Sequence, residues 1–437
     1  MNSLGCARAS RSRPAVIALL VALFGGAAHA FWGDTRGAIG ADGSFRSIPL
    51  YLDASRLPRA LAPDGDERLV QNELRIVAAG RPFARIAYEI HAVQTVNLIE
   101  EDGGLASEGA AILSEAPSRV RYRALDLTSD WLEEEHATGS LSIDHLLVAL
   151  SLDRADIVVG RQAITFGKAY FWNPLDVFAP FDPRRFDRDY KRGVDAARID
   201  VPFGSFSGVT VVGVAGDRVR SGEAEGEEKA WSASGHGSAL VGHVYTTRSG
   251  FDLAVQAGKV YGGRQAGGAI AGEIGPIEVR AEGAYLRASG DPDPLPAPLT
   301  GAVIENHGTF VLGLGRYYAS TLRLEAEVLY NGLGDPDDRI ASLARVAAGG
   351  AFHASRFLAG GLATCDITPI VGGSAAAIVS LDDGSFQVQP GLRWSTGDNS
   401  ELLAGAVLNA GEAPDPLPRS EFGTYPDFYY AEFKVYF

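Results

Sequence analysis

Apolar and charged residues alternate along many short segments of this chain. Residues 277–282 read Ile-Glu-Val-Arg-Ala-Glu, and residues 322–328 read Leu-Arg-Leu-Glu-Ala-Glu-Val. Segments 73–76 and 85–91 repeat the alternation. Because successive side chains of a β-strand point to opposite faces, each segment has one apolar face and one charged face. The pattern predicts an all-β protein. It is either a soluble sandwich whose apolar faces form a core, or a transmembrane barrel whose apolar faces meet lipid.

The same alternation, bounded by turn residues, predicts about 18 strands, within a range of 16–18. The expected strands span residues 43–52, 68–79, 83–95, 142–152, 156–166, 194–202, 207–216, 230–245, 250–261, 265–274, 276–288, 304–317, 321–331, 351–364, 369–380, 385–396, 401–410 and 427–437.

The connections between these strands alternate in length. Tight turns are expected at 80–82, 153–155, 203–206, 246–249, 275, 318–320, 365–368 and 397–400. Longer connections are expected at 53–67, 96–141, 167–193, 217–229, 289–303, 332–350 and 411–426, whereas 262–264 and 381–384 are short exceptions. Bacterial outer-membrane barrels keep short turns in the periplasm and long loops outside, but a Greek-key sandwich does not sort its connections in this way. The alternation of short and long connections therefore predicts a transmembrane up-and-down antiparallel β-barrel with both termini in the periplasm.

The first thirty residues have the layout of a secretory signal. Three arginines precede an apolar run from Pro14 to Gly26, and Ala28-His29-Ala30 offers small residues to a signal peptidase. The run is shorter than the roughly 20 residues that a membrane-spanning helix needs. We therefore expect residues 1–30 to be cleaved and residues 31–437 to form a single barrel domain. An N-terminal anchor helix is the alternative.

The C-terminus carries a second signal. Tyr429, Ala431, Phe433, Val435 and Phe437 form an unbroken apolar face, and the sequence ends at this last phenylalanine. A final amphipathic strand with a terminal aromatic residue resembles the signature by which outer-membrane barrels are recognised for assembly. We therefore expect Phe433, Val435 and Phe437 to be read by the barrel-assembly machinery.

Charge and composition narrow the partners. The net charge of −15 falls to −18 without residues 1–30, because that segment holds three arginines and no acidic residue. A chain with this much negative charge binds phosphate backbones poorly. We therefore expect no nucleic-acid partner. Cys365 is the only cysteine after the signal, which excludes an intramolecular disulfide. No later stretch of 18 apolar residues occurs, which excludes membrane-spanning helices.

The motifs of enzymes are not found in the sequence. It has no Gly-x-Ser-x-Gly elbow and no His-Glu-x-x-His helix, and Ser234-Gly235-His236-Gly237-Ser238 lacks an evident orienting acid. The histidines are scattered singly, with no pair at metal-ligand spacing on a shared face. We therefore expect no catalytic residue, no cofactor, no metal site and no enzymatic activity.

The stretch 160–193 is the candidate for pore selectivity. It begins as a strand and then breaks at Asn173-Pro174 and Asp182-Pro183, which favour turns. In one interpretation residues 167–193 fold into or over the pore, and their basic side chains set its charge selectivity. In the other they form an extracellular loop that Arg–Asp pairs hold to the rim or to lipopolysaccharide. The candidate residues, including neighbours on the flanking strands, are Arg161, Lys168, Arg184, Arg185, Arg188, Lys191 and Arg198.

Aromatic residues are concentrated in the same stretch. They are expected either to form a greasy slide for a sugar or for a hydrophobic solute, or to belong to an interfacial aromatic girdle. The residues are Tyr170, Phe171, Trp172, Phe178 and Phe181.

Several of these motifs point to a family. The Gly160-Arg161-Gln162 strand, the Asn173–Pro180 run and the strand that starts at Lys191 resemble porin-like outer-membrane proteins of proteobacteria, related in style to alginate-export and similar large barrels. The segment 382–394 resembles a late-barrel hairpin of such proteins. The resemblance implies a Gram-negative outer-membrane channel, set in lipid and lipopolysaccharide, for passive passage of a small solute or an oligosaccharide. A plugged, non-conducting barrel with a structural, adhesive or enzymatic role is the alternative, with residues 31–67 or 96–141 as the plug.

Overall fold

The computed structural model describes most of the chain after the expected signal. The described residues are 32–33, 40–58, 65–100, 122–134, 136–181, 183, 190–216, 233–290, 304–347, 351–415 and 417–437. The expected signal peptide, residues 1–30, lies outside them. Among the described residues, no helix is both long enough and apolar enough to span a membrane.

The described strands form one antiparallel sheet. They are β1 (Trp32–Gly33), β2 (Gly40–Asp53), β3 (Glu67–Phe83), β4 (Ile86–Ile99), β5 (Thr128–Glu134), β6 (Ala137–Ser151), β7 (Asp156–Gln162), β8 (Val194–Pro202), β9 (Ser207–Val214), β10 (Ala239–Arg248), β11 (Phe251–Val260), β12 (Gly263–Ile274), β13 (Ile277–Ala288), β14 (His307–Tyr317), β15 (Arg323–Asn331), β16 (Phe357–Thr368), β17 (Val371–Ser380), β18 (Phe386–Gly397), β19 (Ser400–Ala410) and β20 (Asp427–Tyr436). A short helix, α3 (Arg339–Ala347), lies in the connection between β15 and β16.

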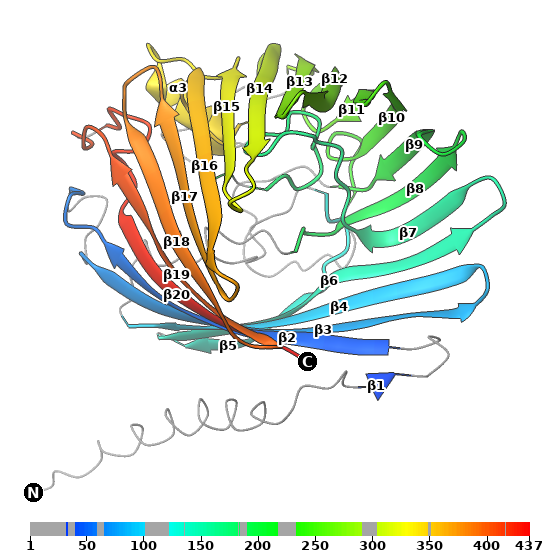
Figure 1. Ribbon diagram of the computed structural model, residues 1–437, viewed down its shortest axis with the longest axis horizontal. Helices are drawn as coiled ribbons and strands as arrows, with labels where there is room; N and C mark the ends of the chain where they lie inside the picture. Colours follow the sequence, from blue (N-terminus) through cyan, green and yellow to red (C-terminus); the bar gives the residue numbers. More distant parts are fainter. Residues whose placement is uncertain are drawn as a thin grey trace, which may run out of the picture.

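Eighteen of the strands, all but β1 and β5, form a closed ring (Figure 1). Each pairs with its neighbours along the chain, β4 pairs directly with β6, and β2 closes the ring by pairing with β20. Closure gives every wall strand two partners, so no edge strand is left with unpaired backbone groups. The expected up-and-down antiparallel barrel of about 18 strands is confirmed.

Two short strands lie outside the ring and were not expected from the sequence. β1 pairs with the start of β2, and β5 pairs with β6 at Ala137–Ser142. The neighbouring β7 pairs with β6 only from Leu146 onward, so β5 extends the wall where β7 does not reach. β5 falls within the connection expected at 96–141. Its sequence, Thr-Ser-Asp-Trp-Leu-Glu-Glu, lacks the alternation by which the other strands were predicted.

The connections are sorted by length between the two ends of the barrel. One end, the turn end, carries the short turns, such as Ser249–Gly250 between β10 and β11. Both residues of that turn have positive φ, 54° and 79°, as tight hairpins require. The opposite end, the loop end, carries the long connections, with 261–262 and 381–385 as short exceptions. This agrees with the sorting expected from the sequence.

Both ends of the ring of strands lie at the turn end. The N–H of Gly43 donates to the carbonyl of Phe437 at 2.7 Å, and the N–H of Phe437 donates to the carbonyl of Gly43 at 2.9 Å. A Cβ on Gly43 would lie 2.4 Å from the Phe437 ring, so the close approach needs glycine. The terminal phenylalanine therefore takes part in closing the barrel.

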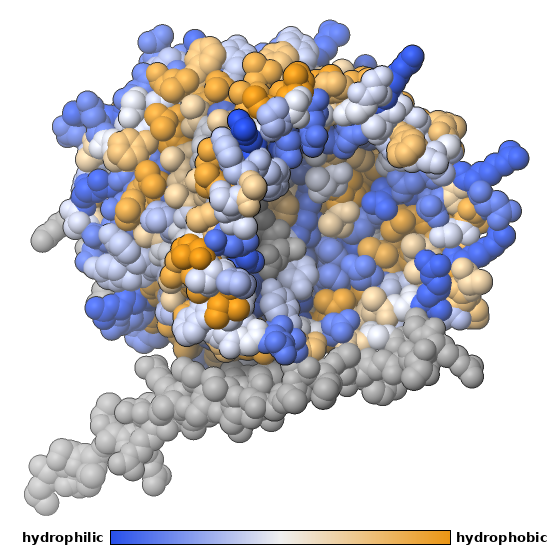
Figure 2. Space-filling view, viewed as in Figure 1, coloured by the Kyte–Doolittle hydropathy of each residue, from blue (hydrophilic) through white to orange (hydrophobic). Residues whose placement is uncertain are grey.

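The burial of the wall strands is inverted relative to a soluble protein. On β15, Glu325 and Glu327 are 3% and 2% exposed, whereas Leu324 and Val328 are 39% and 47% exposed. Figure 2 shows hydrophobic residues spread over the outside of the wall strands. A soluble sandwich would bury its apolar faces and expose its charges. The apolar faces therefore point outward, as in a barrel that meets lipid.

Candidate functional site

The connection between β7 and β8 turns into the barrel. We call its described residues 163–181 and 190–193 the inner loop. In Figure 1 this segment runs inside the ring of strands. Its residues contact inward-facing side chains of strands that run from β9, beside the start of the loop, to β17 across the ring. Of the two expected positions, inside the pore or on the outer rim, the described part of the loop takes the first.

Two glutamates of the barrel wall hold the backbone of the inner loop. Glu282 on β13 accepts hydrogen bonds from the N–H groups of Lys168 and Leu175, each at 2.7 Å. Glu327 on β15 accepts from the N–H groups of Tyr170 and Phe171, at 2.5 and 2.8 Å. The loop has no sheet partner for these donors, so each carboxylate supplies two charge-assisted bonds that the backbone requires.

Leu175 packs against small residues of the wall, and its side chain is fully buried. It packs on Ala254, Ala269 and Ala284, which come from the adjacent strands β11, β12 and β13. The amide of Gln256 on β11 donates to the carbonyl of Leu175 at 2.9 Å. The wall therefore fixes both the side chain and the backbone of this residue.

Aromatic side chains anchor the rest of the loop. Phe171 and Trp172, 3% and 4% exposed, pack against a cluster that includes Val311 and Leu358 of the wall. A Cβ at Gly360 would lie 3.0 Å from both rings, so β16 accommodates them through a glycine.

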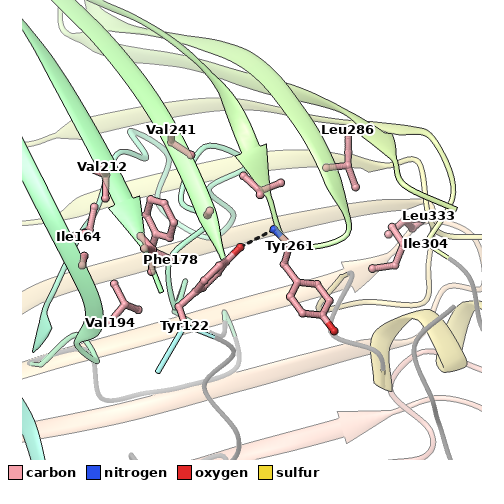
Figure 3. Close-up of a cluster of buried hydrophobic side chains, with 14 residues drawn as sticks. Tyr122, Ile164, Phe178, Val194, Val212, Val241, Tyr261, Leu286, Ile304 and Leu333 are labelled. Atoms are coloured by element: carbon pink, nitrogen blue, oxygen red, sulfur yellow. Dashed lines mark hydrogen bonds between the residues drawn. The ribbon is translucent and has the colours of Figure 1, made fainter. Parts of the chain in front are cut away.

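Phe178 lies in a separate buried cluster with Tyr122, Val212 and Val241 (Figure 3). The Tyr122 hydroxyl accepts a hydrogen bond of 2.9 Å from the N–H of Tyr261, which ties the segment before β5 to the residue that follows β11. Burial leaves the rings of Phe171, Trp172 and Phe178 no free face for a solute, while Tyr170 and Phe181 are half-buried. The buried aromatics thus attach the loop to the wall.

A buried ion pair joins the two parts of the inner loop. The Lys191 amine donates to both carboxylate oxygens of Asp176, and the two residues are 9% and 4% exposed. Burial raises the pKa of the Asp176 carboxyl and lowers the pKa of the Lys191 amine, because a poorly hydrated site disfavours either charge. Their mutual attraction opposes both shifts.

The wall facing the end of the inner loop is lined with paired charges. Arg46 on β2 binds Glu73 on β3 at 2.7 Å, and Arg75 on β3 binds Asp144 on β6 at 3.3 Å. The Tyr190 ring lies 4.1 Å from the Arg75 guanidinium carbon and so covers it. The inner loop therefore contacts this wall as well as the opposite one.

Comparisons with known proteins agree with this architecture. No protein-family model matches the chain, and no curated protein sequence matches it. Solved structures do match. A BenF-like porin from Pseudomonas fluorescens Pf-5 superposes with a TM-score of 0.56 at 9% identity, covering 91% of this chain and 98% of that porin. Acinetobacter baumannii OccAB2 gives 0.55 at 8% identity, with 91% and 98% covered. Pseudomonas aeruginosa OpdK, solved with vanillate, gives 0.52 at 11% identity, with 93% and 100% covered.

The chain has an outer-membrane porin fold. At these identities the likeness concerns the fold alone. It corrects one expectation, because the barrels that this porin fold resembles are of the Occ type and not of the alginate-export type that the sequence motifs suggested. Motifs such as Gly160-Arg161-Gln162 resemble those of porin-like barrels, but they are too short to distinguish these types.

The structure describes four of the seven expected selectivity residues, and each has an acidic partner. Arg161 is 2% exposed and binds Asp195 at 2.7 Å, and Lys191 is held by Asp176. Arg161 also donates to the carbonyls of Ile143 and Leu125, so it fastens the loop end of the wall.

The other two described candidates are less buried. Lys168 lies 3.5 Å from Asp252, and Arg198 lies 2.8 Å from Asp200. The remaining three, Arg184, Arg185 and Arg188, lie outside the described residues.

The residues that hold the loop were not singled out from the sequence. Glu282 and Glu327 belong to the alternating segments 277–282 and 322–328, where they mark the charged face. Nothing in those segments separates them from neighbouring charges such as Glu278. Their role depends on which part of the wall the inner loop crosses, and only the folded barrel shows this.

Proposed function

We propose that this chain is an outer-membrane channel for the passive passage of small solutes and that the inner loop narrows its lumen. The observation that carries the proposal is the attachment of the loop, through Glu282 and Glu327, to the inward face of the wall. Barrels of 16–18 strands enclose a lumen that wall side chains alone do not fill. A loop bound within that lumen sets the width and the chemistry of the path.

Charge selectivity is assigned in this proposal to Arg184, Arg185 and Arg188. They begin three residues after the end of the anchored segment 163–181, and Lys191, a basic residue of the inner loop, is neutralised by Asp176. Three arginines that face the path would favour anions or the anionic end of a small solute. OpdK, a protein with this fold, was solved with an aromatic carboxylate, vanillate. A small carboxylate is therefore the solute class to test first, with a neutral oligosaccharide as the comparison.

The proposed setting follows from the same reasoning. The apolar outer faces lie in the outer membrane among lipid and lipopolysaccharide, and the turn end, with the C-terminus, faces the periplasm. The barrel-assembly machinery reads the last strand. In this proposal the protein has no enzymatic activity.

The test is the conductance of the refolded protein in a planar bilayer under a salt gradient. The variant R184A/R185A/R188A is compared with R248A/R264A/R287A. The control removes the same number of charges from exposed arginines, on strand faces that also present the exposed Leu240, Ile270 and Tyr285. The reversal potential of the first variant should shift toward cation preference, and that of the control should stay at the value of the unaltered protein.

Two other outcomes have clear meanings. Steady conductance with the same reversal potential in every protein would support the channel function. It would contradict the assignment of charge selectivity to the three arginines. No conductance from protein shown to be folded and inserted would contradict the channel and favour a plugged, non-conducting barrel.

A further inference from the structure

Three potential metal ligands converge on the lumen wall away from the contacts of Glu282 and Glu327. Glu89 and His91 lie two residues apart on β4 and therefore share a face. His145 on β6 is the direct cross-strand partner of His91. The pairing then shifts so that Ala92 opposes Ile143, which leaves Asp144 as the extra residue of a β-bulge. Such a bulge redirects side chains, and Asp144 and His145 are both buried.

The three side chains already form one group. His91 Nε2 lies 2.9 Å from Glu89 Oε1, and His145 Nδ1 lies 3.0 Å from the same oxygen. One nitrogen or oxygen from each residue lies within 4.8 Å of the others, and the two imidazole rings stack at 4.2 Å. Ligands about 2.0–2.2 Å from one Zn²⁺ lie about 3–3.5 Å from each other. The backbone therefore brings two imidazoles and a carboxylate to the spacing of a shared cation.

The second nitrogen of His145 defines the protonation of its ring. His145 Nε2 lies 3.0 Å from the backbone carbonyl of Lys191, which can only accept, so Nε2 carries a proton. In the neutral ring Nδ1 then presents a lone pair to the Glu89 carboxylate. Two acceptors at 3.0 Å need a positive species between them, either a second proton or a metal cation. A backbone carbonyl on the other ring nitrogen is also how proteins orient metal-binding histidines.

His91 adds an independent observation. It is 6% exposed, and its Nδ1 is buried without a hydrogen-bond partner among the described residues. The hydrogen-bonding interaction of this ring among the described residues is therefore made by Nε2, which lies at Glu89. A bond from Nε2 to a cation held with Glu89 would replace this interaction.

The neighbouring charges do not compete for Glu89. Arg75 lies 3.3 Å from Asp144 and 3.6 Å from Glu73, and Arg123 also binds Asp144. These groups neutralise one another and leave the Glu89 carboxylate to the two imidazoles. Its side chain is 37% exposed, whereas those of His91 and His145 are 8% and 10% exposed. Lumen water therefore reaches the group at Glu89, and three protein ligands leave a coordination position open for it.

We propose that Glu89, His91 and His145 bind a divalent transition-metal ion such as Zn²⁺, and that the ion stiffens the end of the inner loop through the bond between His145 and the Lys191 carbonyl. Nitrogen and carboxylate ligands of this kind suit Zn²⁺ better than Mg²⁺ or Ca²⁺. This inference goes beyond the proposed channel function and does not depend on it. The sequence predicted no metal site, because it shows these histidines singly and only the pairing of β4 with β6 brings them together.

The first test is metal binding by the refolded full-length barrel in detergent, by equilibrium dialysis against Zn²⁺ followed by elemental analysis. We expect one tightly bound Zn²⁺ per chain, and at least tenfold weaker binding in E89Q and in H145A. H307A is the matched control, because it removes a single histidine at the loop end and should bind as the unaltered chain does. Heat-dependent gel mobility checks that each variant is folded. If H145A does not refold, E89Q still tests the site, because glutamine keeps the shape of the glutamate side chain.

Binding of Co²⁺ gives a second readout, since visible absorption bands of a nitrogen-ligated ion should appear in the unaltered chain and in H307A but not in H91A/H145A. Absence of bound Zn²⁺ in the unaltered folded chain, or equal binding by the double variant, would overturn the site. Slower amide exchange of residues 190–193 on addition of Zn²⁺ is expected in the unaltered chain and not in E89Q. Zn²⁺ binding without that protection would overturn the stiffening of the loop.

Discussion

The carboxylate of Glu282 accepts a hydrogen bond of 2.7 Å from the backbone N–H of Leu175, which lies 107 residues earlier in the chain. The side chain of Leu175 packs against three alanines on the same wall. A barrel strand thus provides both the polar and the apolar contact for one loop residue. This arrangement fixes an irregular segment inside the lumen without sheet pairing.

Replacing both anchoring carboxylates should release the inner loop. In E282Q/E327Q each amide keeps one acceptor oxygen but directs its NH₂ group at a second backbone donor. Each lost bond to a buried N–H should cost about 1–3 kcal/mol. We expect faster amide exchange of residues 168–175 and larger fluctuations of the open-channel current.

E273Q is the control, because Glu273 is an exposed glutamate near the turn end of β12. Equal exchange of residues 168–175 in the double variant and in the control would contradict the anchoring role of Glu282 and Glu327.

The connection between β19 and β20 should loosen in acid because of Glu421. Its carboxylate accepts from the N–H of Ser355 at 2.8 Å and lies 3.0 Å from His353 Nδ1. Burial alone would raise the pKa of Glu421, but the bonds from His353 and Ser355 lower it below the ordinary value. A lowered pKa in the folded state stabilises it above the unfolded pKa of about 4.3, and the gain is lost as pH falls through the folded value.

We therefore expect amide protection of residues 353–355 to be steady at neutral pH and to fall below about pH 4.3, after correction for intrinsic exchange. E421Q should lack that protection at every pH, while E412Q, an exposed glutamate of the same connection, should follow the unaltered protein. Protection that persists unchanged in E421Q would rule out this carboxylate as the contact.

Placing a charge on the outward face of the wall should destabilise the barrel. Leu312 lies in the middle of β14 and is 66% exposed, whereas Leu417 is 52% exposed in the connection between β19 and β20. Arginine facing the bilayer midplane costs about 2–4 kcal/mol, but an exposed loop substitution stays within about 0.5 kcal/mol. We expect L312R, and not L417R, to lower the free energy of unfolding in lipid vesicles. Equal effects would show that β14 does not face the hydrocarbon.

The side chain of Phe437 should matter more for assembly in the cell than for stability. Its backbone closes the ring against Gly43, and those two hydrogen bonds survive in F437A. We expect F437A to accumulate several-fold less folded barrel in the outer membrane while refolding normally into detergent. F310A, which removes a 52% exposed phenylalanine from the middle of β14, is the control for loss of aromatic surface. Normal assembly of F437A would show that the side chain of Phe437 is not part of the signal read by the barrel-assembly machinery.

Much of the wall could be predicted because the signals for a strand are local. The alternation in segment 277–282 states which side chains share a face, and turn residues mark where a strand ends. All eighteen wall strands were located in this way. The strand alternation alone did not decide the direction of the faces, because a sandwich and a barrel share it, and the barrel was predicted from the sorting of the connections by length. The exposure of residues such as Leu312 beside the burial of Glu327 settles that question.

The sequence by itself determined the strands, their order, the sorting of turns and loops, and the choice of residues 160–193 as the candidate for pore selectivity. Each of these features depends on residues that are close together in the chain. Only the tertiary structure decided what lies inside the barrel. The closed ring brings Glu282 to Leu175, and the pairing of β4 with β6 brings His91 to His145. Such partners come from separate strands whose local patterns are alike. The physical reason is that alternation specifies a face, whereas a contact across the lumen depends on register, closure and the path of the loop.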